Sequence, residues 1–71
     1  MPCVLPDGSV APVAKRVLSS AREARSAEDI AKDTGLPIYR VRGSIRELME
    51  AGLVEETGGK YQTTEAGRKK V

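Results

Sequence analysis

The sequence predicts one small α+β domain, mainly helical, in which three helices form the core and a two-stranded β-hairpin follows them. Three observations predict this order. Apolar residues recur at helical spacing in three successive stretches, glycines at positions 35 and 52 end two of them, and a Gly-Gly pair separates two short β-prone runs. A chain of 71 residues has room for one modest core. We expect residues 1–9 to form a flexible segment and residues 10–71 to form the domain.

The first helix is expected over residues 11–24, with Pro12 in its first turn. The apolar residues at helical spacing that would face the core are Val10, Val13, Ala14, Val17, Leu18 and Ala21. The basic residues elsewhere on it, which either contact phosphates or form an ordinary solvated face, are Lys15, Arg16, Arg22 and Arg25. The preceding prolines and Asp-Gly turn signal predict a mobile segment or one short strand that pairs with the hairpin.

The second helix is expected to begin after Ser26, whose hydroxyl can accept from the N–H groups that open a helix while Asp29 reaches back. Glu28 and Asp29 also lie near the positive end of the helix dipole. Gly35 supplies the left-handed residue that a tight exit requires, so the helix is only about two turns long. Its apolar stripe consists of Ala27, Ile30 and Ala31.

The third helix is expected from Pro37 to Ala51, with Gly52 as its C-terminal stop. A rotation of about 100° per residue divides its side chains into two faces. The face that we expect to join the core carries Ile38, Val41, Ile45, Leu48 and Met49. The opposite, presented face carries Tyr39, Arg42, Gly43 and Arg46.

The presented face has the residue types that contact phosphates and guanine edges in a major groove. Two arginines lie one turn apart beside a tyrosine, and Gly43 between them lets a large partner come close. Most exposed helix faces are simply solvated, and that reading stays open here. Gly43 argues against it, because a glycine within a helix costs about 1 kcal/mol relative to alanine, although glycine can also relieve crowding against another helix.

After Gly52 the pattern changes from helical to extended, which predicts a hairpin. Gly58 and Gly59 fit a two-residue turn with positive φ. Thr64 can cap a last short helical turn. The runs on either side of the turn are LVEET, residues 53–57, and KYQT, residues 60–63.

The run IAKDTGLPIYRVRGSIRELMEAGLVEETGGKYQTTEAG resembles the core of winged helix-turn-helix proteins of the small bacterial and archaeal transcriptional-regulator type. The resemblance covers about two thirds of the chain, and its most specific pieces are residues 30–36, 46–54 and 60–67. It implies that Pro37 to Ala51 is the recognition helix in the major groove, that Gly58 and Gly59 form the tip of the wing, and that double-stranded DNA is the ligand. The DNA-binding residues then expected are Tyr39, Arg40, Arg42, Gly43, Arg46 and Lys60.

Two features depart from the DNA-binding pattern. The wing carries the acidic residues Glu55 and Glu56, and Lys60 is its only basic residue. The tip of the wing is also very short. Winged helices also serve as protein–protein interaction modules within larger assemblies, so this alternative stays open. A single short winged helix contacts one half-site, and useful affinity therefore needs a homodimer, neighbouring copies or a larger protein partner.

Composition argues against an enzyme, a cofactor site and a metal site. The chain has no histidine, the usual general base, and no glycine-rich phosphate loop or metal-ligand spacing. Cys3 is the only cysteine and is expected to be a free thiol without a structural role. No run approaches membrane-spanning length, so we expect a cytoplasmic protein without membrane contact. The net charge of +2 says little, but the positive charge lies on the expected first and third helices and on residues 64–71.

Overall fold

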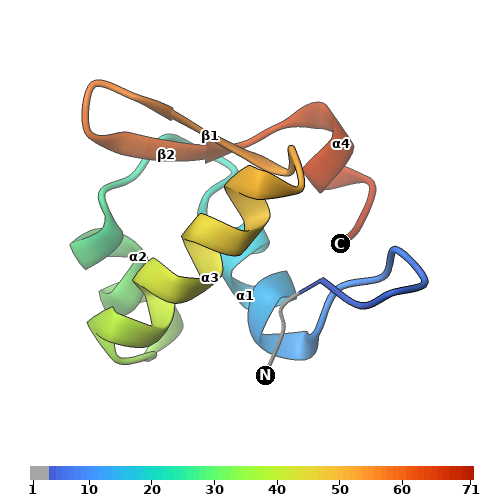
Figure 1. Ribbon diagram of the computed structural model, residues 1–71. Coiled ribbons are helices and arrows are strands. Elements are labelled where there is room, and N and C mark those ends of the chain that lie inside the picture. The colour runs from blue at the N-terminus through green and yellow to red at the C-terminus, as the bar shows by residue number, and fades with distance from the viewer. Residues whose placement is uncertain (1–3) are drawn as a thin grey trace.

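The computed structural model describes residues 4–71, and its elements follow the predicted order. The helices are α1 (Pro12–Ser20), α2 (Ala27–Thr34), α3 (Ile38–Glu50) and α4 (Glu65–Arg68), and the strands are β1 (Val54–Thr57) and β2 (Lys60–Thr63). The hairpin lies over the three longer helices, with α4 next to its base (Figure 1). The predicted α+β class is confirmed, and the arrangement is consistent with a winged-helix layout. The thiol predicted at Cys3 lies outside the described residues.

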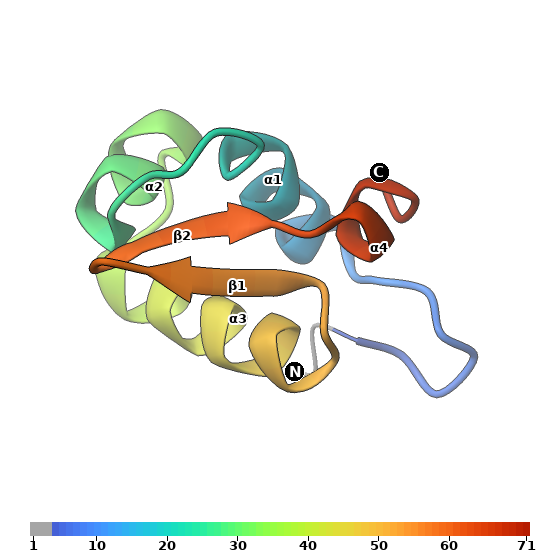
Figure 2. The same ribbon diagram turned by 90° about the horizontal axis from the view of Figure 1, so that it is seen from above.

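The helix α1 is shorter than predicted. It ends at Ser20, and the chain then turns so that Arg25 pairs with the hairpin. The Arg25 N–H donates to the Tyr61 carbonyl oxygen at 3.0 Å, and the Tyr61 N–H donates to the Arg25 carbonyl oxygen at 2.7 Å. The prediction of a helix through residue 24 is therefore wrong, because the chain turns after Ser20 and Arg25 then pairs with β2 (Figure 2).

The N-terminal segment pairs with itself. Val4 and Val10 form an antiparallel bridge around a turn, and Val4 packs against the core. The Asp7 carboxylate accepts hydrogen bonds from the Ser9 N–H at 3.0 Å and the Ser9 hydroxyl at 2.6 Å. Within residues 4–10, the predicted pairing with the hairpin is thus replaced by a local turn, and Arg25 takes the place beside the wing.

The core is aliphatic and lies between the three longer helices and the base of the hairpin. The predicted stripe of α3 is confirmed at Val41, Ile45 and Leu48, whose exposed fractions are 0, 4 and 0%. The prediction is wrong for Met49, which is 38% exposed because it lies on the side of α3 that borders an open groove beneath the wing. The other buried apolar residues are Val10, Ala14, Val17, Leu18, Ala21, Ala27, Ile30, Leu53 and Val54, while Val13 and Ile38 are only half-buried.

The ends of α2 and α3 lie where the sequence predicts them. The Ser26 hydroxyl accepts a hydrogen bond from the Asp29 N–H at 3.1 Å, although the structure of residues 4–71 shows no return bond from the Asp29 carboxylate. Gly35 ends α2 with a φ of 75°. Pro37 and Ala51 occupy the two cap positions of α3, so this helix has the predicted extent to within one residue at each end.

The wing is a short antiparallel hairpin with Val54 opposite Thr63 and Thr57 opposite Lys60. Gly58 and Gly59 form the predicted tight turn, with φ values of 58° and 80° that only glycine adopts readily. The predicted cap at Thr64 is also confirmed, since its hydroxyl accepts from the N–H at position 67 across 3.2 Å and opens α4. None of the helices in the described part of the chain is long and apolar enough to span a membrane.

Candidate nucleic-acid interface

The outer face of α3 carries the four residues predicted for it. Tyr39 is 74% exposed, and Arg42 and Arg46 are also exposed, whereas Gly43 is partly covered. The opposite face of the helix is fully occupied by core contacts, since it buries Val41, Ser44, Ile45 and Leu48. The core fixes the rotation of α3 and therefore the direction in which the arginines point.

Two further predicted residues are exposed but lie away from this face. Arg40 is on the other flank of α3, roughly 160° around the helix from Arg42 at 3.6 residues per turn, and it is exposed. Lys60 is the first residue of β2, at the tip of the wing. These two cations therefore do not form one compact cluster with Arg42.

Gly43 has open space in front of it. A Cβ built at this position meets no atom within 4 Å apart from the backbone of its own helix and its neighbours. Crowding inside the described part of the chain therefore does not explain the glycine. Its φ also lies in the ordinary helical range, since the positive φ values occur at other glycines. A glycine within a helix destabilises it by about 1 kcal/mol relative to alanine. No contact within the described part of the chain explains why Gly43 is kept despite this cost.

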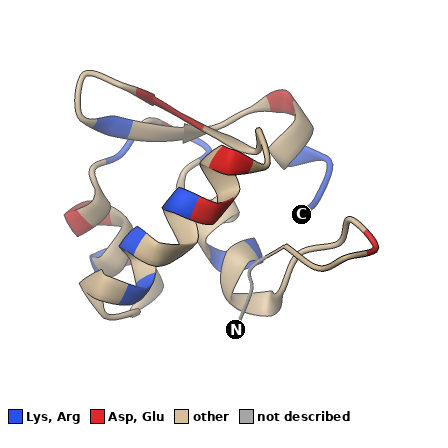
Figure 3. Ribbon diagram, viewed as in Figure 1, with Lys and Arg blue, Asp and Glu red and all other residues tan. Residues whose placement is uncertain are grey.

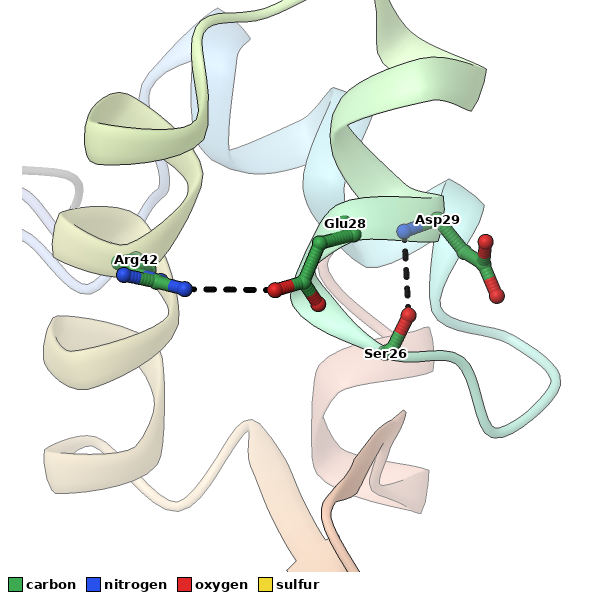
Figure 4. A network of polar contacts seen from close by, with 4 residues as sticks. All are labelled: Ser26, Glu28, Asp29 and Arg42. Atoms are coloured by element: carbon green, nitrogen blue, oxygen red, sulfur yellow. Dashed lines mark hydrogen bonds and ion pairs between the residues drawn. The ribbon is translucent and has the colours of Figure 1, made fainter.

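Glu28 is a neighbour of this face that the sequence did not reveal. Its carboxylate accepts from the Arg42 guanidinium, with 3.3 Å between Oε2 and Nη2. Figure 4 shows the Glu28 carboxylate directed at Arg42, whereas the Asp29 carboxylate points away from it. Both partners keep 63% of their side-chain surface exposed. The ion pair thus joins the first turn of α2 to the middle of α3 at the surface.

A groove of about 330 Å³ runs between α3 and the wing. Arg42 and Arg46 line it from the helix, and Glu56 and Tyr61 line it from the wing, with Ile45 and Met49 between them. The sequence predicted neither Tyr61 nor Met49 here, because the hairpin reaches α3 only in the folded chain. The groove offers apolar surface beside two guanidinium groups.

The charges around this face are mixed. Figure 3 shows both basic and acidic residues on α3, which carries Arg40, Arg42, Arg46, Glu47 and Glu50, and acidic residues on β1. Glu55 and Glu56 are exposed on β1, as is Lys60 on β2. Carboxylates on a wing repel DNA phosphates, so the electrostatics favour contact through α3 over contact through the wing.

Two of the basic residues before α2 contact other parts of the chain. The Arg16 guanidinium donates to the carbonyl oxygen of Thr34 at the end of α2, and Arg25 lies beside the wing instead of on α1. Lys15 and Arg16 line a second, shallow concavity of about 380 Å³ with Ser19, Ser20, Asp33 and Thr34. This surface is formed by α1 and α2 and is separate from the outer face of α3.

Comparison of the chain with protein-family models gives no match, and a search of curated proteins gives none either. Within residues 4–71, no group of three or more acidic, cysteine or histidine side chains is placed to hold a metal ion. The function has to be inferred from the residues and their geometry.

Proposed function

We propose that this chain binds duplex DNA through the outer face of α3, in the manner of a winged helix-turn-helix transcriptional regulator. The observation that carries the proposal is the empty space in front of Gly43, between the exposed arginines at positions 42 and 46. A helical glycine without an internal neighbour is explained by an external partner that must approach the helix backbone closely. The major groove of DNA, about 12 Å wide, admits an α-helix in this way.

The spacing of the two arginines supports the same ligand. Four residues of helix rise about 6 Å, which is close to two base-pair steps of about 3.4 Å each. Arg42 and Arg46 can therefore reach guanine edges or phosphates about two steps apart. Tyr39, 74% exposed at the start of the helix, adds a hydroxyl that can bond to a phosphate.

The acidic wing limits the size of this interface. Glu55 and Glu56 disfavour entry of the wing into a minor groove, so α3 makes the main contact and Lys60 reaches at most a flanking phosphate. One helix on one half-site gives a small interface. We propose that useful affinity requires a second copy or attachment to a larger protein.

Fluorescence anisotropy with a short random-sequence duplex tests the proposal. We expect binding at low salt that weakens steeply as salt rises, with a slope near −0.9 for each phosphate contact. Replacing Arg42 and Arg46 together by alanine should abolish most of the affinity while leaving the melting temperature unchanged, because both side chains are exposed. Arg68→Ala together with Lys69→Ala removes two exposed positive charges outside the outer face of α3 and is the control. No binding by the parent chain at low salt would refute the proposal.

A protein-interaction module is the second candidate, and the groove beneath the wing favours it. Met49 and Tyr61 give this groove an apolar lining that a phosphate backbone does not need. A protein partner seated there would bind with little dependence on salt, in contrast to DNA. Met49→Ala would then weaken binding more than Arg46→Ala, and the same pair of variants distinguishes the two candidates.

A further inference from the structure

The ion pair between Glu28 and Arg42 does not have the character of a stabilising contact. Its two side chains are 63% exposed, and exposed ion pairs add little to the free energy of unfolding. Buried apolar residues already join the helices that carry it, Ile30 on α2 and Val41 and Ile45 on α3. The main effect of Glu28 is therefore on the position and the charge environment of Arg42.

The carboxylate restricts Arg42 in two ways. It holds one end of a long, flexible side chain, which reduces the number of rotamers that the guanidinium occupies before a ligand arrives. It also places a negative charge 3.3 Å from the Nη2 atom. A phosphate that bonds to the same guanidinium must approach this like charge, whereas a neutral base edge meets no such repulsion.

We propose that Glu28 is a positioning residue that directs Arg42 to a base edge in preference to a phosphate and so sets the specificity of the interface. This inference rests on the proposed DNA-binding function. The guanidinium keeps donors that are not bonded to Glu28, because arginine has five N–H donors and the pair is held through one nitrogen. Guanine, with its adjacent N7 and O6 acceptors, is the base that fits them.

The chain contains a matched control for the charge of Glu28. Asp29 lies next to it in the first turn of α2, but its carboxylate points away from Arg42 (Figure 4). Glu28→Gln and Asp29→Asn each remove one negative charge at the same end of the same helix. Both should raise the affinity for random duplex DNA, because repulsion from phosphates decreases, and Glu28→Gln should raise it more, because it also removes the like charge beside the Arg42 guanidinium. They should differ in sequence discrimination.

The test begins with the parent chain and a pool of randomised duplexes, from which a preferred sequence is selected. Dissociation constants are then measured for that sequence and for each single base-pair change. Arg42→Ala should remove the discrimination at one base pair, which for a bidentate contact amounts to about 5- to 150-fold. Glu28→Gln should reduce discrimination at that same base pair by about threefold or more. It should have no further effect when Arg42 is already alanine. Asp29→Asn should leave the discrimination at this base pair unchanged.

A measurement without DNA completes the test. The Arg42 side-chain Nε–H should be more mobile on the nanosecond scale in Glu28→Gln than in the parent or in Asp29→Asn, by heteronuclear relaxation. Equal discrimination in the Glu28 and Asp29 variants, or unchanged Arg42 mobility, would overturn the positioning role while the DNA-binding proposal stands. A parent chain that binds no duplex would overturn both.

Discussion

The Thr63 hydroxyl donates a hydrogen bond of 2.7 Å to the carbonyl oxygen of Leu18, which ties the last residue of β2 to the end of α1. The Thr63 N–H makes a second bond to the same helix end, at 2.8 Å from the Ala21 carbonyl oxygen. The last carbonyl groups of a helix have no hydrogen-bond partners within the helix, and here Thr63 of the wing provides partners for Leu18 and Ala21. These bonds keep the wing beside the helices, although 45 residues separate Thr63 from Leu18.

Thr63→Val tests this attachment. Valine keeps the shape of threonine but removes the donor, so a buried carbonyl oxygen loses its partner at a cost of about 1–3 kcal/mol. Thr57→Val, at the exposed end of β1, is the control and should change stability by about 0.5 kcal/mol or less. Urea denaturation measures both. Equal stability of the two variants would show that the Thr63 hydroxyl does not hold the wing.

Gly43 and Gly67 should respond to alanine in opposite directions. Gly43→Ala fills open space on a helix and should raise the free energy of unfolding by about 0.5–1 kcal/mol, while it weakens binding to duplex DNA. A Cβ at Gly67 would overlap the carbonyl oxygen of Leu53, so Gly67→Ala should destabilise the domain by about 1–3 kcal/mol. Denaturation and anisotropy give the two readouts. A stabilised Gly43→Ala variant with parental DNA affinity would place this glycine outside the interface.

Leu48 and Met49 are adjacent in α3 but differ in burial, with exposed fractions of 0 and 38%. Leu48→Ala should therefore cost about 2–5 kcal/mol through the cavity that it leaves, a large part of the stability of so small a domain. Met49→Ala should cost much less, about 0.5 kcal/mol, because the Met49 side chain is partly exposed in the open groove and its loss leaves no closed cavity. Thermal unfolding followed by circular dichroism compares them. Similar losses would mean that the wing closes over Met49 in solution.

The pKa of the Asp7 carboxyl group should lie below its ordinary value. The hydrogen bonds from the Ser9 hydroxyl and then from the Ser9 N–H stabilise its ionised form and lower its pKa. Because the folded-state pKa is the lower one, the contribution of this turn to stability is present above the unfolded-state pKa and is lost as pH falls through the folded-state value. Ser9→Ala should raise the pKa of Asp7 in a carboxyl-carbon NMR titration, while Ser19→Ala should not change it.

The sequence predicted the features that depend on neighbouring residues. The cap at Ser26, the left-handed exit at Gly35 and the tight turn at Gly58 and Gly59 are each set by local chemistry, and all three are confirmed. The periodicity of α3 correctly separated its core face from its presented face, except at Met49 on the boundary.

Features that depend on distant pairing could not be predicted. Residues 21–25 have helical composition, but the backbone bonds between Arg25 and Tyr61 end the helix early, and nothing in the local pattern indicates a partner 36 positions away. The Glu28 carboxylate reaches Arg42 only because α2 packs against α3, so the sequence indicates no more than its place near the positive end of the α2 dipole. The groove beneath the wing has the same origin, since it exists only where β2 meets α3.

A titration of the ¹⁵N-labelled chain with a random-sequence duplex at low salt, followed by amide chemical shifts, tests most directly whether α3 is the DNA-binding element. We expect binding, with the largest shifts along residues 39–46 and at the first turn of α2, and smaller shifts on the acidic strand β1. The absence of shifts at high DNA concentration, or shifts confined to α1 and α4, would contradict the proposal.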